Sequence, residues 1–219
     1  YWYNTSTPLV AFKSDYEKMR QSKLLKENTG PVVKKTTSFP KEPIANGKYK
    51  IRINHTGKYL AIEGASKDNG ARLVQWDYVD QANHQFYVRN IGGGYYDISA
   101  VHSKRYLNAA GQSKADNTAV IQWDFANQDN VKWRIYYSNQ GGKPGWVIEN
   151  KNASPIQLQS GLLTNQNGEP LILWMPKRQD ANDYEPFQTF SFEKIDELPM
   201  SETKLYEQSP GMKTKKSNR

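Results

Sequence analysis

The stretch LVQWDY at residues 73–78 recurs as VIQWDF at residues 120–125. The two glutamines lie 47 residues apart, since 122 − 75 = 47, and the similarity extends well beyond six residues. At the same spacing, YKIRINHTGKYLAIEG at residues 49–64 aligns with YDISAVHSKRYLNAAG at residues 96–111. A fixed period between 20 and 50 residues is typical of repeated structural units that bury a core only together.

A third and weaker copy begins near Trp146 and continues through Trp174 to Phe190. Its spacing from the second copy grows along the chain from 50 residues (146 − 96) to 57 residues (190 − 133). The third copy therefore carries insertions. Phe86, Trp133 and Phe190 end the same pattern in the three copies, and we expect them to form one buried hydrophobic layer.

Each copy is predicted to contain four short β-strands. In the first copy, residues 49–53 alternate in polarity, a turn around Gly57 follows, and residues 59–62 form the second strand. The third and fourth strands are expected at residues 73–77 and 85–89. Twelve strands in three copies predict an all-β fold, a β-trefoil in which three hairpins cap a six-stranded barrel. Three blades are too few to close a propeller, and a solenoid needs atypical terminal repeats.

The composition changes outside the repeats. We expect an N-terminal extension over residues 1–44, the trefoil over residues 45–195 and an irregular C-terminal tail over residues 196–219. The extension is predicted to contain one short helix at about residues 14–27, which opens on a capping-box pattern, followed by a proline-rich strap. The three copies of the trefoil are expected at about residues 46–92, 93–140 and 141–195.

The composition of the 219 residues excludes several classes of protein. No run of 18 apolar residues could span a membrane, and the chain has no cysteine for a disulfide framework. Of the net charge of +8, residues 1–44 carry +4 and residues 196–219 carry +1, so the repeats carry only +3. Nucleic acid would require a dense basic stripe on the folded part, so we expect no nucleic-acid partner.

The strings VQWDYVDQANHQF at residues 74–86 and IQWDFANQDNVKW at residues 121–133 resemble the ricin B-type, or QxW, lectin repeats. The similarity covers about residues 46–194. This resemblance implies a β-trefoil with one shallow sugar site per repeat. In such a site an indole face stacks on a hexose ring, while side-chain amides and a carboxylate bind the sugar hydroxyl groups. The resemblance also implies that single copies often lose their site.

Carried over to this chain, the resemblance places the stacking indoles at Trp76 and Trp123. Each is followed seven residues later by an amide partner, Asn83 or Asn130. Packing inside the fold is the alternative for both tryptophans, since repeated tryptophans commonly belong to a core. The two asparagines have an alternative as well, because asparagine is a common turn former.

The acid of the family pattern is missing. Its position falls at Ala61 in the first copy, at Asn108 in the second and at Leu158 in the third. Asparagine can accept a hydrogen bond from a sugar, but without charge assistance. We therefore expect no sugar site in the third copy. The second copy keeps the most complete site, consisting of Asn108, Trp123, Asp124 and Asn130.

The first copy is expected to hold half a site, formed by Trp76, Asp77, Asn83 and His84. His84 stands where the family has its closing glutamine. For Asp77 and Asp124 the alternative to ligand contact is a structural role, in which the carboxylates hold their own loops through backbone amides.

No pattern in the sequence points to catalysis. His55, His84 and His102 have no metal-ligand spacing, and the chain lacks a G-x-S-x-G elbow, a P-loop and a G-x-G-x-x-G pattern. We therefore expect no enzymatic activity, no metal and no cofactor.

Two hypotheses for the function follow. The resemblance implies a carbohydrate-binding module that recognises a glycan on a cell surface or a polysaccharide. It would be the receptor-recognition component of a secreted, toxin-like assembly or larger protein, with another chain bound through residues 1–44 and 196–219. The alternative is a trefoil scaffold that binds no sugar and mediates protein–protein interaction through these arms. A protease inhibitor and a heparin-type binder are weaker alternatives.

The two hypotheses differ in the surroundings that they predict for Trp123. The carbohydrate hypothesis predicts an exposed Trp123 in a concave site, with Asn108 and Asn130 turned toward it. The scaffold hypothesis predicts a buried Trp123 and a large apolar patch elsewhere, near the arms.

Overall fold

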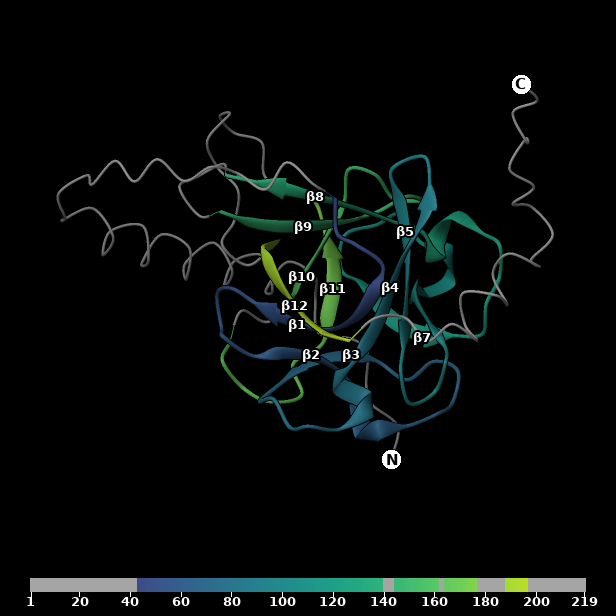
Figure 1. Cartoon of the computed structure of the whole chain (residues 1–219). Helices are drawn as coiled ribbons and strands as arrows, with labels where there is room; N and C mark the ends of the chain where they lie inside the picture. The colour runs from purple at the N-terminus through teal and green to yellow at the C-terminus, as the bar shows by residue number, and fades with distance from the viewer. Residues whose placement is uncertain (1–42, 140–143, 162–163, 177–187, 197–219) are drawn as a thin grey trace, which may run out of the picture. The chain divides into compact units, whose positions relative to one another are not determined.

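The structure is a computed structural model that describes residues 43–139, 144–161, 164–176 and 188–196 (Figure 1). The expected N-terminal helix, most of the strap and nearly all of the C-terminal tail lie outside these residues. The described residues form twelve strands and four 3₁₀ helices, with no α-helix among them. Within this part of the chain there is accordingly no helix long and apolar enough to cross a bilayer.

Each copy contributes four strands, close to the predicted positions. The first copy contains β1 (Gly47–Ile53), β2 (Tyr59–Ile62), β3 (Leu73–Trp76) and β4 (Phe86–Gly92). The second contains β5 (Tyr95–Ala100), β6 (Tyr106–Ala109), β7 (Thr118–Trp123) and β8 (Trp133–Ser138). The third contains β9 (Gly145–Asn150), β10 (Gln157–Ser160), β11 (Leu171–Trp174) and β12 (Phe190–Asp196). The 3₁₀ helices are η1 (Glu63–Ala65), η2 (Ala82–His84), η3 (Ala110–Gln112) and η4 (Asp129–Val131).

Six of the strands close into a barrel. β1 pairs with β4 and β12, β5 pairs with β4 and β8, and β9 pairs with β8 and β12, all antiparallel. Such a closed ring leaves no free sheet edge. The other six strands form the hairpins β2–β3, β6–β7 and β10–β11. This arrangement confirms the predicted β-trefoil (Figure 1).

The three hairpins meet one another and form the cap of the trefoil. Backbone bridges join them in pairs, at Arg72–Ile121, Val74–Pro170 and Ala119–Ile172. The ends of β3, β7 and β11 therefore lie beside turns that belong to a different copy. The candidate binding residues are located at these junctions.

The predicted hydrophobic layer is present inside the barrel. Phe86, Trp133 and Phe190 are the first residues of β4, β8 and β12, and all three are fully buried. The indole Nε1 of Trp133 donates a hydrogen bond to the carbonyl oxygen of Leu107 at 3.2 Å. Burying this large side chain therefore leaves its polar group satisfied.

Truncating the buried indole should destabilise the fold strongly. We expect Trp133→Ala to lower the free energy of unfolding by about 3–5 kcal/mol, because it removes apolar contacts and leaves a cavity. The control is Trp123→Ala, which shortens an indole near the surface and should cost only about 1 kcal/mol. Urea unfolding followed by circular dichroism measures both variants. Equal losses would contradict the assignment of Trp133 to the core.

Candidate functional site

Trp76 and Trp123 reach the surface at equivalent positions. They are the last residues of β3 and β7, and their exposed fractions are 38% and 44%. Trp174 ends β11 in the same way but is only 7% exposed. Two of the three copies therefore present an indole to solvent, as the carbohydrate hypothesis expects for Trp123.

Each exposed indole also lies against a turn of another copy. A Cβ atom added to Gly70 would lie 3.8 Å from the Cζ3 atom of Trp123, and one added to Gly168 would lie 3.5 Å from that of Trp76. Both glycines have a positive φ, of 89° and 84°, which glycine adopts at little cost. The neighbouring turn thus covers part of each indole, which accounts for its partial burial.

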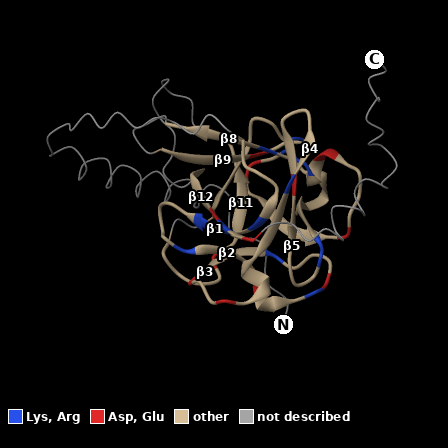
Figure 2. Ribbon diagram, viewed as in Figure 1, with Lys and Arg blue, Asp and Glu red and all other residues tan. Residues whose placement is uncertain are grey.

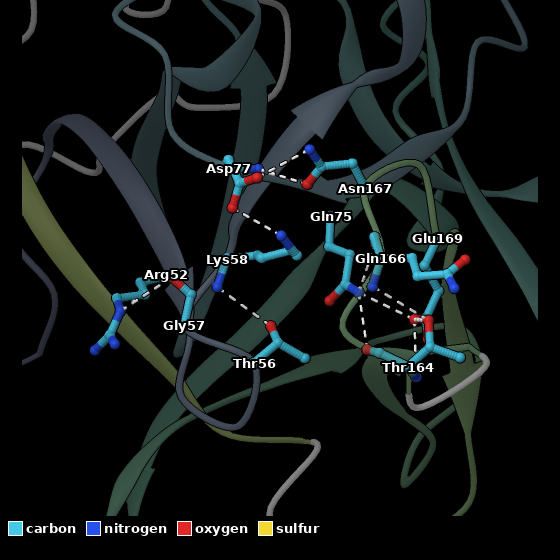
Figure 3. Close-up of polar contacts among 10 residues, drawn as sticks. All are labelled: Arg52, Thr56, Gly57, Lys58, Gln75, Asp77, Thr164, Gln166, Asn167 and Glu169. Carbon is cyan, nitrogen blue, oxygen red and sulfur yellow. Dashed lines mark hydrogen bonds and ion pairs between the residues drawn. The ribbon is translucent and has the colours of Figure 1, made fainter.

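The glutamines that precede these tryptophans hold the same turns. The Nε2 group of Gln122 donates hydrogen bonds to the carbonyl oxygens of Ser66 (2.8 Å) and Asp68 (2.9 Å). Gln75 donates in the same way to two carbonyl oxygens in the turn at residues 164–168, at 3.0 Å each (Figure 3). Both side chains are fully buried. The glutamine of the repeated sequence therefore joins two copies and does not face a ligand.

Asp124 joins the second copy to the first. Its backbone N–H donates to Oδ1 of Asn69 at 2.9 Å, and Nδ2 of Asn69 donates to the carboxylate at 2.8 Å. Arg105 forms an ion pair with the other carboxylate oxygen at 3.1 Å. The side chain of Asp124 nevertheless remains 65% exposed.

Asp77 makes the equivalent contacts with the third copy. Its N–H donates to Oδ1 of Asn167 at 2.9 Å, and Nδ2 of Asn167 returns a hydrogen bond to the carboxylate at 3.0 Å (Figure 3). Lys58 lies 2.7 Å from the other oxygen, and its hydrogen bond lowers the pKa of Asp77, whose side chain is 70% exposed. The structural alternative for both aspartates expects their carboxylates to hold their own loops through backbone amides. In the structure each carboxylate instead accepts from an asparagine side chain in a loop of the neighbouring copy.

The junction between the second and third copies lacks this arrangement. Met175 occupies the position of the aspartate, and its N–H donates to the carboxylate of Asp116 at 2.7 Å. At this junction the acid therefore stands on the neighbouring turn, at the position of Asn69, and not directly after the tryptophan. An exposed carboxylate beside an exposed indole therefore occurs at two of the three junctions.

Asn108 and Asn130 lie together but face each other. Nδ2 of Asn130 donates to Oδ1 of Asn108 at 3.0 Å and to the carbonyl oxygen of Ala109 at 3.3 Å. Asn108 pairs with Ile121, two residues before Trp123, and therefore lies on the same face of the hairpin as the indole. Both asparagines are buried. The structure brings the predicted amides of the second copy together below the surface.

The amide partners of the first copy are buried as well. Nδ2 of Asn83 donates to the carbonyl oxygen of Ile62 at 3.1 Å, which ties η2 to the hairpin. His84 is buried beside the ring of Tyr78, and burial lowers the pKa of the imidazole. Ala61, at the position of the family's acid, is buried too. The exposed part of this half-site is therefore Trp76 with Asp77.

The register of the third copy corrects one prediction. Trp174 pairs with Gln157 as Trp123 pairs with Tyr106, so Gln159 and not Leu158 corresponds to Asn108. The turn between β9 and β10 is one residue longer than the turn between β5 and β6, which shifts the alignment by one position. The acid of the family is therefore replaced by a buried amide in this copy also.

A buried ion pair supports the hairpin that carries Trp123. Tyr106 lies opposite Trp123, and its ring packs against Phe125 with 4.9 Å between the centroids. Arg89 donates to the hydroxyl of Tyr106 at 2.6 Å and pairs with Asp97 at 2.9 Å. Burial raises the pKa of Asp97 to about 6, although Arg89 opposes this rise.

The sequence did not single out Lys58, Asn69, Arg105 or Asn167. Two signals were present, because Lys58 and Arg105 are 47 residues apart and both asparagines precede a turn glycine.

Within the described ranges, no three His, Cys, Asp or Glu side chains cluster closely enough to hold a metal ion. His102 instead contacts the carbonyl oxygen of Ser66 at 2.7 Å, which is a structural role.

Acid should destabilise the fold through His84. Because burial holds its pKa below 6.5, the unfolded chain takes up a proton first as the pH falls through this value. Between about pH 7 and pH 5, the wild type should therefore lose more unfolding free energy than His84→Gln. Urea unfolding at each pH measures the difference in unfolding free energy between the two proteins. The contributions of the titrating groups that both proteins share cancel in this difference. Identical pH profiles would show that His84 is not held neutral by burial.

Acidic and basic residues are interspersed over the described strands and turns, without a stripe of one sign (Figure 2).

Two overlapping segments, residues 38–123 and 82–174, match the model of the ricin-type β-trefoil lectin domain-like family. These segments together extend over more than half of the chain. A comparison with curated protein sequences found no match.

Solved structures with a similar fold include a designed threefold-symmetric protein, ThreeFoil. It is 26% identical with a TM-score of 0.61, and the match covers 68% of this chain and 99% of ThreeFoil. An exo-β-1,3-galactanase from Clostridium thermocellum is 23% identical with a TM-score of 0.59, over 72% of this chain and 31% of the galactanase. The Rhizoctonia solani agglutinin is 17% identical with a TM-score of 0.58, over 70% and 99% of the two chains.

The family match covers the first two repeats and reaches the end of β11 in the third, and the barrel, the hairpins and the threefold hydrophobic layer agree with it. The chain belongs to the ricin-type β-trefoil lectin domain-like family.

Proposed function

We propose that the chain is a carbohydrate-binding module that uses Trp76 and Trp123 as stacking platforms. The observation that carries this proposal is the exposure of both indoles at equivalent hairpin ends. An indole held by packing on one side and open on the other offers a rigid apolar surface to a sugar ring. The family is a lectin-domain family, in keeping with binding that involves no catalysis.

The second copy is the more complete of the two candidate sites. Its predicted amide partners, Asn108 and Asn130, lie on or beside the hairpin that carries Trp123, but both are buried. In the first copy, Asn83 and His84 are the corresponding predictions for Trp76. The third copy is expected to bind no sugar, because Trp174 is buried.

We further propose that the module is secreted and recognises a glycan for a larger, toxin-like assembly. The trefoil accounts for about two-thirds of the chain, and residues 1–44 and 196–219 flank it. The solved galactanase supports a modular use of this fold, since the match spans only 31% of its length. In this proposal the flanks bind another chain or domain of the assembly.

A scaffold without sugar binding is the second candidate function. It is favoured by the amide or alanine at all three positions of the family's acid, Ala61, Asn108 and Gln159. Lys48 pairs with Asp196, so the first and last barrel strands lie side by side where the flanks begin. Arms that leave from one place could bind a single partner.

A glycan array tests the carbohydrate proposal. The wild type should bind a defined set of glycans, and Trp123→Ala should weaken binding at least about tenfold because the stacking surface is lost. Trp76→Ala should weaken it as well, by a smaller factor. Ile195→Ala, which shortens an exposed apolar side chain on β12, is the matched control and should bind like the wild type. A folded wild type that binds no glycan at high density would favour the scaffold.

A further inference from the structure

The amides within the second copy are poorly accessible to a sugar. Nδ2 of Asn130 already donates to Asn108 and to the carbonyl oxygen of Ala109. Both asparagines are more than nine-tenths buried. A ligand that stacks on Trp123 would meet little of this pair, and Oδ1 of Asn130, which has no hydrogen-bond partner among the described residues, is shielded from solvent. The polar partners of a bound sugar should therefore come from elsewhere.

The exposed polar groups beside each indole belong to the junctions between copies. Asp124 directly follows Trp123 and is 65% exposed, while Asp77 directly follows Trp76 and is 70% exposed. Asn69 of the neighbouring turn contacts the carboxylate of Asp124, and that same turn lies against the indole. The indole and the carboxylate thus form one continuous surface with the turn of another copy.

These carboxylates can accept further hydrogen bonds. A carboxylate has about four lone-pair sites on its two oxygens. In Asp124, one oxygen accepts from Asn69 and the other faces Arg105. Asp77 uses its oxygens in the same way with Asn167 and Lys58. Because both side chains are mostly exposed, acceptor sites remain open to sugar hydroxyl groups, and the neighbouring cation fixes the carboxylate in place.

We propose that each glycan site is built from two copies, with its hydrogen-bonding groups at the junction. One site would consist of Trp123 and Asp124 with Asn69 and Arg105, and the other of Trp76 and Asp77 with Asn167 and Lys58. This inference rests on the proposed function and relocates the polar half of the site. The aspartate that follows the tryptophan takes the role of the acid that the hairpin lacks.

The third junction sets the number of sites. It carries the buried Trp174 and, in place of the aspartate, Met175. Its acid, Asp116, stands on the neighbouring turn and accepts from the N–H of Met175. The part of the chain that the structure describes therefore offers two composite sites and no third one.

The charge of the junction selects the class of ligand. A carboxylate accepts from neighbouring hydroxyl groups of a neutral sugar, and such charge-assisted hydrogen bonds are strong. A sialic or uronic acid placed over Asp77 or Asp124 would bring two negative charges together, and the cations of the sites, Lys58 and Arg105, are mostly buried and already paired with these aspartates. The composite sites should therefore bind neutral hexose or N-acetylhexosamine residues in preference to acidic sugars.

The test compares a junction variant with a hairpin variant. The junction variant is Asp77→Asn with Asp124→Asn, which keeps the size of both side chains and removes their charges. The hairpin variant is Asn108→Ala, after which Asn130 can still donate to Ala109. The probes are an array of neutral and sialylated glycans, followed by calorimetric titration with the neutral glycan that the wild type binds most tightly.

We expect two sites in the wild type, a loss of affinity of at least about tenfold in the junction variant, and less than about twofold in Asn108→Ala. The reverse order would overturn the composite site while the carbohydrate function stands. A folded wild type that binds no glycan would end both proposals. A preference for sialylated glycans would also contradict the composite site.

A second measurement needs only the wild-type protein. In an NMR titration with the same glycan, the indole N–H signals of Trp76 and Trp123 should shift, together with the side-chain amide signals of Asn69 and Asn167. Shifts of the Asn108 and Asn130 amide signals in their place would overturn the proposal. This result does not depend on whether a variant folds.

Discussion

The buried amide of Gln122, bonded to a turn of another copy, is the contact on which this part of the cap depends. Backbone carbonyl groups that are removed from water need a donor, and Gln122 supplies one to Ser66 and another to Asp68. The backbone reinforces the contact, because the N–H of Gly70 donates to the carbonyl oxygen of Gln122 at 2.9 Å. The position of the next residue, Trp123, against Gly70 follows from this fixed arrangement.

The third copy shows what happens when the glutamine is replaced. Leu173 stands at this position and has no amide to give, although the N–H of Asn117 still donates to its carbonyl oxygen at 2.8 Å. The carbonyl oxygen of Ala115 in the adjoining turn instead accepts a hydrogen bond from within the turn, because the hydroxyl of Thr118 donates to it at 2.6 Å. The third copy thus differs from the other two at a junction where the adjoining turn makes its own hydrogen bond and does not accept one from a glutamine of the neighbouring copy. At this junction the indole of Trp174 is buried.

The parts of the structure that lie within a single copy and recur in the others could be predicted from the sequence, because equal spacing along the chain implies equivalent positions in the fold. The layer of Phe86, Trp133 and Phe190 and the placement of the strands are of this kind. Contacts between copies could not be predicted, since a period of 47 residues does not indicate which turn a side chain meets. Asn69 and Asn167 were missed for this reason. Gln159 was missed because one extra residue in a turn shifts an alignment based on spacing alone.

The location of the charges follows from solvation. A carboxylate at the position of Asn108 would be buried next to Asn130, and burying an ionised group costs far more than a single amide donor returns. A neutral asparagine accepts the same hydrogen bond at much lower cost. Asp77 and Asp124 stay mostly in water, each with a cation within 3.1 Å, so their charge carries little desolvation penalty. If this trefoil uses a carboxylate to bind a sugar, the junction between copies is where the fold allows it to remain ionised.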